Sequence, residues 1–196
     1  GIDYHGHSVK QGTCFYIAGE GHNGFARRCI AWANSHDVDL RKVPFFKSNK
    51  AVVMNDPHAV DIMHQTIKEL SQQYGSPSIV CIDTVDRSMG GDENSTKDMN
   101  EFVQQIDKIK DEHGCTVLLA HHTGVATKER ARGSSALLGA LDCEFKIERF
   151  NDTTTTVTFT KMKDAEEPDQ MAFLKVPVTM MTDDGDELSS IVLEQV

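Results

Sequence analysis

The sequence predicts an α/β domain with a mainly parallel sheet and a β-rich, antiparallel C-terminal edge. The first observation behind this prediction is that short apolar runs alternate with amphipathic helical patterns as far as Arg149. The second is that the pattern becomes β-rich from Thr153 onward. The third is size, because 196 residues with 39% hydrophobic side chains suit one core. We therefore expect residues 1–196 to form a single domain.

The strands are predicted from short apolar runs that end in turn or polar residues. Thr13–Ala18 ends in a Gly-Glu-Gly turn, Ser78–Asp83 closes in an acid, and Cys115–Ala120 ends in two histidines. Continuous apolar runs of this kind are typical of parallel strands covered on both faces, so we expect buried strands. Cys143–Arg149 is expected to add another strand.

Helices are predicted between these strands by apolar residues at helical spacing. The first follows residue 21, with Asn23 as a candidate cap. Its stripe consists of Phe25, Cys29, Ile30 and Trp32. The second runs from Asp56-Pro57 to Tyr74, because proline suits a first helical position. The third runs from Lys97 to His113, before Gly114, and a short helix is expected over Ser134–Leu141.

The other segments are expected to be irregular or hairpin-like. Val38–Val53 contains a proline and a polar turn, and Arg87–Ser95 is a polar, glycine-containing loop. After Thr153, two β-rich segments precede a closing hairpin around Asp184-Gly185. The whole pattern gives strand, helix, strand, helix, strand and then antiparallel ribbons.

Charge and hydropathy exclude some classes of protein. Twenty Lys and Arg against thirty Asp and Glu give a formal charge of −10, so any contact with nucleic acid must be local. No run is long and apolar enough to span a bilayer, and no secretory signal pattern opens the chain. We expect a soluble protein without a membrane partner.

Cysteine and histidine usage favours a reducing, cytoplasmic compartment. The five cysteines are scattered, form no CxxC pair, and mostly lie in apolar runs, so we interpret them as buried thiols. The nine histidines show no recognised metal-ligand spacing. We therefore predict no metal site from histidine or cysteine spacing.

Polar residues follow the predicted strands where an open parallel sheet binds ligands, beyond the carboxyl ends. Glu20, Asp83 and His122 are in such positions. An acid after a strand is also common as a cap or turn residue, and loop histidines are common. However, four apolar residues followed by an acid form a Walker B pattern, in which the carboxylate holds the Mg²⁺ of a bound nucleotide.

The chain resembles the RecA-like hexameric helicases and ATPases, especially the RepA-like replicative helicase domain of plasmids and phages. The resemblance extends from about Thr13 to Asp169 and keeps the family's order of motifs. It rests on four blocks: FYIAGEG with GFARRCIAW, IVCIDTVDRSMGGDENSTKDMNEF, LLAHHTG with RARGSSALLGALD, and TKMKDAEEPD. It implies a RecA-like P-loop NTPase fold, ATP and Mg²⁺ as ligands, a hexameric ring and ATP hydrolysis coupled to DNA unwinding.

The resemblance also implies roles for individual residues. Glu20 matches the glutamate that polarises the attacking water, His122 the sensor of the γ-phosphate, and Asp83 the metal-binding Walker B carboxylate, with Thr84 beside it at the nucleotide. Lys161 and Lys163 resemble the pair of cations presented to the nucleotide of a neighbouring subunit. The alternative for these lysines is protection of an exposed sheet edge.

Two loops correspond to the DNA-contacting loops of the family's central channel. One is Arg87–Ser95, and the other is Gly124–Gly133, which carries Lys128, Arg130 and Arg132. Both lack aromatic residues, so we expect contact with the backbone of single-stranded DNA and no base stacking. A solvated loop is the alternative.

The family's phosphate-binding motif, GxxxxGK(S/T), does not occur in these 196 residues. Phe25 and Ala26 follow Gly19–Gly24 where Lys and Ser or Thr would be required. The chain is therefore either a fragment of a longer ATPase or a gene piece without its nucleotide cradle, and alone it should hydrolyse ATP no faster than a Glu20→Gln variant. The alternatives are a non-catalytic assembly or DNA-binding module, or a recombinase-type or regulatory ATPase.

The missing motif has a consequence for the expected sheet. In the family, the P-loop strand lies between the strands that correspond to Cys115–Ala120 and Cys143–Arg149. Unpaired backbone groups beside an empty slot would each cost about 1–3 kcal/mol. We expect Ile2–Val9, direct closure of the flanking strands, or a strand from a second chain to fill it, and favour a strand-exchanged or edge-paired dimer.

Overall fold

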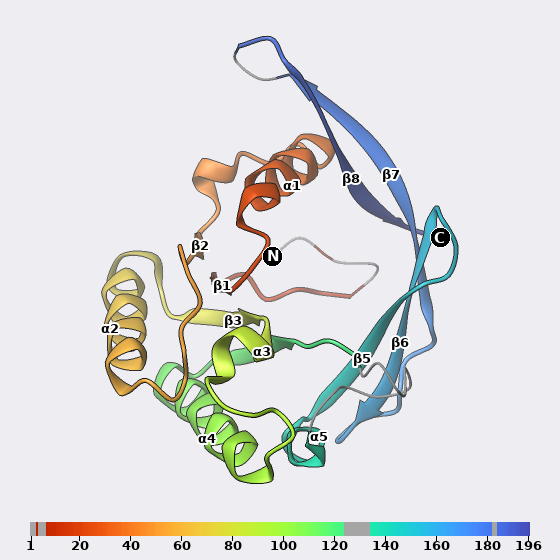
Figure 1. Cartoon of the computed structure of the whole chain (residues 1–196). Helices are drawn as coiled ribbons and strands as arrows, with labels where there is room; N and C mark the ends of the chain where they lie inside the picture. Colours follow the sequence, from red (N-terminus) through yellow and green to blue (C-terminus); the bar gives the residue numbers. More distant parts are fainter. Residues whose placement is uncertain (1–2, 4–6, 124–133, 182–183) are drawn as a thin grey trace. The chain divides into compact units, whose positions relative to one another are not determined.

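The computed structural model describes residues 3, 7–123, 134–181 and 184–196. The chain divides into two compact units (Figure 1), one within residues 1–22 and 43–140 and the other within residues 23–42 and 141–196. Among the described residues, no helix is both long enough and apolar enough to cross a membrane.

The first unit contains a four-stranded parallel sheet in the order β2-β1-β3-β4. Three of its strands were predicted: β1 (Thr13–Ala18), β3 (Pro77–Asp83) and β4 (Thr116–Ala120). The edge strand β2 (Phe45–Lys47) lies in the segment expected to be irregular. It was missed because a strand of three residues is too short to show a period.

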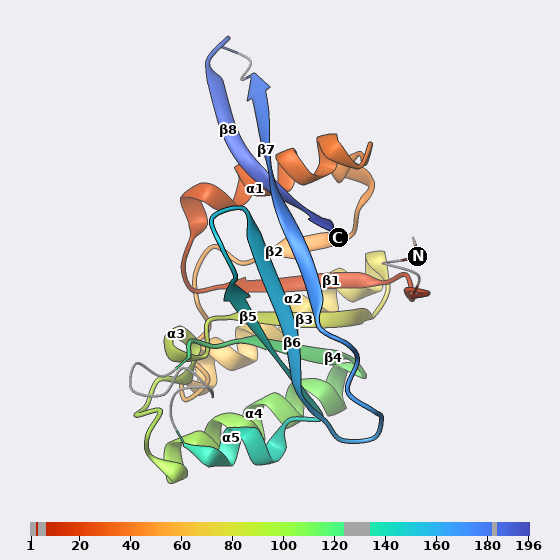
Figure 2. The same cartoon turned by 90° about the vertical axis from the view of Figure 1, so that its right-hand side faces the viewer.

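Helices connect these strands and cover one face of the sheet, as Figure 2 shows for α2 and α4. The long helices confirm the predicted boundaries: α2 is Pro57–Tyr74 and α4 is Thr96–His113. Asp56 caps α2 by accepting hydrogen bonds from the backbone N–H groups of residues 58 and 59. Gly114 ends α4 in the left-handed conformation, with φ of 62°.

Two short helices complete the first unit, α3 (Val85–Met89) and α5 (Ser135–Ala140). The helix α5 confirms the short helix expected there. The helix α3 corrects the expectation that Arg87 begins a loop, because residues 85–89 are helical and only the following residues are irregular. A single helical turn gives too little periodicity to be recognised in sequence.

The core of the first unit lies on the sheet face that α2 and α4 cover. Phe15 and Ile17 of β1 are in register with Val80 and Ile82 of β3, and all four are at most 5% exposed. Because side chains alternate along a strand, the residues between them face the other side and are half-buried. The prediction of strands buried on both faces therefore holds for only one face of β1 and β3.

The edge strand β4 is more exposed than expected. Leu118 is 38% exposed, and Thr116 and Ala120 are exposed as well. The reason is positional, since β4 pairs with β3 on one side and with no described strand on the other. The expectation of buried thiols is also wrong in part, because four cysteines are half-buried and Cys143 is exposed.

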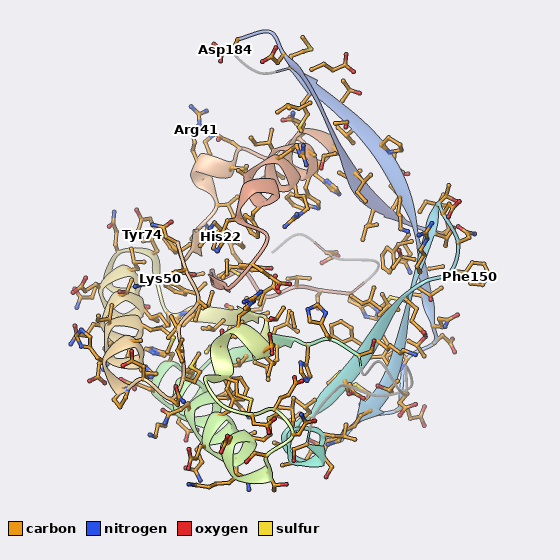
Figure 3. The ribbon with its side chains drawn as sticks, in the orientation of Figure 1. His22, Arg41, Lys50, Tyr74, Phe150 and Asp184 are labelled. Carbon is orange, nitrogen blue, oxygen red and sulfur yellow. The ribbon has the colours of Figure 1, made fainter. Side chains whose placement is uncertain are left out.

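The second unit contains an antiparallel sheet in the order β5-β6-β7-β8. Its strands confirm the β-rich C-terminal segments: β5 (Cys143–Arg149), β6 (Thr154–Met162), β7 (Met171–Met181) and β8 (Glu187–Gln195). The strands β7 and β8 form the expected hairpin, with Met181 opposite Glu187. Phe150, which follows β5 and is labelled in Figure 3, is 75% exposed.

Helix α1 (His22–Ser35) and the short 3₁₀ helix η1 (Leu40–Lys42) also belong largely to the second unit. The apolar stripe expected for α1 is wrong in part, because Ile30 and Trp32 are each 46% exposed. Ala31, which is fully buried, packs instead with Met180 and Val192 of the β7–β8 hairpin. The small alanine allows the helix to approach the hairpin closely, and hydrophobicity alone does not reveal this.

The structure also corrects the expectation of one sheet with an antiparallel edge. The strands β4 and β5 belong to different sheets, so direct closure of these two strands is wrong. Within Ile2–Val9, residues 2 and 4–6 lie outside the described residues, and residues 3 and 7–9 are exposed, with residue 7 in an isolated β-bridge. Of the three expectations for this edge, filling by Ile2–Val9 and pairing with a second chain stay predictions.

Candidate functional site

The candidate site lies at the carboxyl edge of the parallel sheet in the first unit. Asp83 is in register with Ala18 on one side and with Ala120 on the other. Glu20 and His122 each follow their strand by two residues, so the three polar side chains emerge at the same edge. The predicted placement of these three residues at one edge is confirmed, and their catalytic and metal-binding roles stay predictions.

Glu20 is the centre of a loose charged cluster at this edge. One carboxylate oxygen, Oε1, lies 3.7 Å from Nε2 of His122, and the other, Oε2, lies 3.8 Å from Nε of Arg87. The side chains of Glu20, His122 and Arg87 are 41%, 64% and 60% exposed. Exposed pairs at these distances contribute little to stability, so the cluster remains adaptable and accessible to a ligand.

Asp83 is held more firmly than Glu20. The hydroxyl of Tyr16, from the neighbouring strand β1, donates a hydrogen bond to its Oδ2 atom. Two residues earlier on β3, a hydrogen bond with Cys14 raises the pKa of the Cys81 thiol, and burial and the charge of Asp83 raise it further. The Cys81 thiol therefore stays protonated next to the carboxylate. The contact with Tyr16 is a functional candidate that the sequence did not reveal, because it joins residues 67 positions apart.

A close backbone approach positions Glu20 beside Asp83. The N–H of Gly19 donates to the backbone carbonyl of Asp83. A Cβ atom at Gly19 would lie only 2.5 Å from Cβ of Arg87 and 3.0 Å from the Asp83 carbonyl oxygen. Only glycine therefore allows the turn after β1 to pass this close to α3.

Thr84 is next to Asp83, but its hydroxyl faces the interior. The residue is 3% exposed, and its Oγ1 atom is buried with no hydrogen-bond partner among the described residues. It occupies the N-cap position of α3 without making a side-chain cap. A nucleotide or metal ion at this edge reaches the hydroxyl only if the start of α3 moves.

A further cation lies beside β1, at the end of β2. Nζ of Lys47 is 2.8 Å from the carbonyl oxygen of Ser48 and 3.2 Å from Nδ1 of His22, a residue labelled in Figure 3. Ser48 in turn accepts a hydrogen bond from the N–H of Ala18 at the end of β1. Lys47 was not predicted as a site residue, because the strand β2 was not recognised. The basic residues after Phe46 were the feature of the sequence that could have identified it.

The two lysines proposed to act on a neighbouring subunit lie in the second unit. Lys161 is on β6 opposite Glu144, and Lys163 directly follows the strand. Nζ of Lys163 is 3.2 Å from Oδ1 of Asp142, and its N–H donates to the Asp142 carbonyl. Lys163 is therefore tied to the start of β5, and neither lysine is in the unit that contains Asp83.

The proposed DNA-contacting residues are placed only in part. Lys128, Arg130 and Arg132 lie outside the described residues. In the other loop, Arg87 belongs to α3 and approaches Glu20, while Glu93 is buried and Asp98 accepts a hydrogen bond from the N–H of Asp92. The segment Arg87–Ser95 is therefore held by its own contacts, and Arg87 is its single cationic residue.

Comparison with protein families decides the broader assignment. A family model described as an AAA domain matches residues 2–128, which include β1, β3, β4 and the residues gathered around Glu20. The chain belongs to the AAA domain family. AAA domains belong to the P-loop NTPase superfamily and are found in RepA-like helicases. A comparison with curated proteins gives no match. The family supports a nucleotide-binding ATPase domain, and its ATPases generally use ATP and Mg²⁺.

Proposed function

We propose that this AAA domain binds and hydrolyses ATP as part of a RepA-like replicative DNA helicase. The observation that carries the proposal is the convergence of Glu20, Asp83 and His122 at the carboxyl edge of the parallel sheet. Open α/β sheets bind ligands at this edge, and phosphoryl transfer depends mainly on positioning and electrostatics. The family membership supports the same class of reaction.

Glu20 is the base that orients and activates a water molecule. Its carboxylate is 41% exposed, so water reaches it, and His122 and Arg87 approach its two oxygens separately. Because His122 is 3.7 Å from Glu20, a phosphate group that attracts the imidazole also changes the environment of the base. This coupling supports a sensor role for His122.

Asp83 is the residue that would hold Mg²⁺, which supplies charge neutralisation to the phosphates when it is bound. A carboxylate oriented by Tyr16 fits a hard cation that prefers oxygen ligands. Lys47, at the same edge, adds positive charge that favours a polyphosphate. Lys161 and Lys163 are proposed to act on the nucleotide of a neighbouring subunit in a hexameric ring, with single-stranded DNA as the substrate.

The glycine-rich phosphate cradle is not among these 196 residues. We therefore expect the 196-residue polypeptide by itself to hydrolyse ATP no faster than its Glu20→Gln variant. The decisive experiment compares two polypeptides, these 196 residues and the complete product of the source gene, each with the variants Glu20→Gln and Asp83→Asn. The matched control is Glu69→Gln, which removes an exposed acid from α2.

In the complete gene product, Glu20→Gln should lower Mg²⁺-dependent ATP turnover by about 10²–10⁴-fold and leave binding of a non-hydrolysable ATP analogue intact. Asp83→Asn should weaken the Mg²⁺-dependent part of that binding, and Glu69→Gln should change neither measurement. Turnover that survives Glu20→Gln would reject the catalytic role. Nucleotide-independent DNA binding without turnover would support the non-catalytic module instead.

A further inference from the structure

Two histidines and a glutamate from two helices gather in the first unit, away from the carboxyl-edge residues in sequence. Nδ1 of His64, on α2, lies 2.8 Å from Nε2 of His113, at the end of α4. The same Nδ1 atom lies 3.1 Å from Oε2 of Glu112. One ligand atom from each residue falls within 4.8 Å of the other two.

The two imidazole rings face each other edge to edge. Their planes are 21° apart and their centroids are separated by 4.9 Å. When two ring nitrogens are 2.8 Å apart, the ring centroids are farthest from each other if both nitrogens lie on the line between them. The observed centroid distance of 4.9 Å is close to that maximum. The two nitrogen atoms therefore lie nearly on the line between the centroids, so the two rings point at each other through these nitrogens.

The surroundings hold these groups in place. His64 is 8% exposed and lies on the buried face of α2 with Val60, Met63 and Ile67. Glu112 is paired with Lys68, one helical turn along α2 from His64. Because the two rings and the carboxylate are already gathered, a metal ion would have to reorient these side chains but would not have to bring them together.

We propose that His64, Glu112 and His113 form a binding site for a zinc-like divalent transition metal that links α2 to α4. Two imidazole nitrogens and one carboxylate oxygen suit Zn²⁺ and its neighbours in the first transition row. Zn–N bonds of about 2.0–2.1 Å in tetrahedral geometry place the two nitrogens about 3.3 Å apart. The 2.8 Å contact therefore has to open by about half an ångström, and the two rings, which now point at each other, have to tilt so that both nitrogens face the metal.

The site also has a place for a further ligand. His64 and Glu112 contribute to the wall of a cavity of about 530 Å³ between α2 and α4. With three protein ligands, the remaining coordination position of the metal is then available to water or to a small molecule in this cavity. The proposal is independent of ATP hydrolysis, because none of its residues belongs to the cluster around Glu20.

The simplest alternative is a proton shared between the two rings, with the Glu112 carboxylate paired with Lys68 and His64. This arrangement satisfies the same short contacts without any metal. It predicts no selective affinity for transition metals. The two interpretations therefore differ in a direct measurement.

The test titrates Co²⁺ and Zn²⁺ into the full chain after removal of metal by a chelator, with no histidine tag present. Visible absorption of Co²⁺ and competition with a zinc-binding dye report affinity and stoichiometry. We expect one strongly bound ion per chain, with tetrahedral cobalt absorption, and a rise in the unfolding temperature on addition of Zn²⁺.

Variants assign the binding to these residues. His113→Gln and Glu112→Gln should each weaken the affinity by more than about 100-fold, since changes to residues that only hydrogen-bond to a metal ligand already cost about 10–100-fold. Lys68→Met releases Glu112 from its ion pair and should tighten binding. The control His58→Gln changes an exposed histidine on the first turn of α2 and should have no effect.

If His113→Gln fails to fold, Glu112→Gln still tests the proposal, because Glu112 is 37% exposed and its replacement leaves the packing intact. Absence of Co²⁺ and Zn²⁺ binding at millimolar metal would overturn the proposal. Binding that both variants leave unchanged would overturn it equally, because the metal would then be held by other histidines.

Discussion

The two clusters of titratable residues in the first unit differ in how firmly they are held. Around Glu20, the ion pairs are 3.7 and 3.8 Å long and every participant is at least 41% exposed. Around His64, the contacts are 2.8 and 3.1 Å long and His64 is buried. A site that receives a large charged substrate benefits from accessible groups, whereas a site that holds a compact ion benefits from groups already in position.

The largest expected difference between the two clusters is in how much each contributes to the free energy of unfolding. His64→Ala should lower the free energy of unfolding by about 2–3 kcal/mol, because it removes a buried ring and leaves polar partners unpaired. His122→Ala, at a 64% exposed side chain, should change it by less than about 0.5 kcal/mol. Urea denaturation of the two metal-free variants measures both. Equal losses would remove the distinction between a buried and an accessible cluster.

A smaller effect tests how the backbone positions Glu20. Gly19→Ala should cost about 1–2 kcal/mol, because the new Cβ would overlap Arg87 and crowd the Asp83 carbonyl. Gly139→Ala is the matched control, since nothing lies within 4 Å of its Cβ position in α5. The control should be neutral or more stable by about 0.5–1 kcal/mol. Thermal unfolding compares the two, and a harmless Gly19→Ala would show that the close approach is not needed.

The smallest of these effects tests the link between Tyr16 and Asp83. Tyr16→Phe should lower stability by about 1 kcal/mol, because one hydrogen bond to a carboxylate is lost while the ring is kept. Tyr74→Phe, at a 45% exposed residue at the end of α2, is the control and should be neutral. If Mg²⁺-dependent nucleotide binding also falls in Tyr16→Phe but not in the control, the orientation of Asp83 matters for function. Unchanged stability and binding would show that Tyr16 does not orient the carboxylate.

Local signals in the sequence determined most element boundaries in this protein. Asp56-Pro57 and Gly114 mark helix ends because their effects act within one turn of the chain. The strand ends at Ala18, Asp83 and Ala120 were also readable, and the rule for parallel sheets then placed Glu20, Asp83 and His122 at one edge. The sequence was sufficient here because each inference needed only local pattern and topology.

Other features were decided only by the tertiary structure. The buried face of α1 is set by Ala31 against the β7–β8 hairpin, although Ile30 and Trp32 are more hydrophobic. The separation of β4 from β5 depends on which strands find a partner, and the contact between His64 and His113 joins residues 49 positions apart. No local pattern records such pairs, because packing and hydrogen bonding between distant segments depend on where both segments lie in the folded chain.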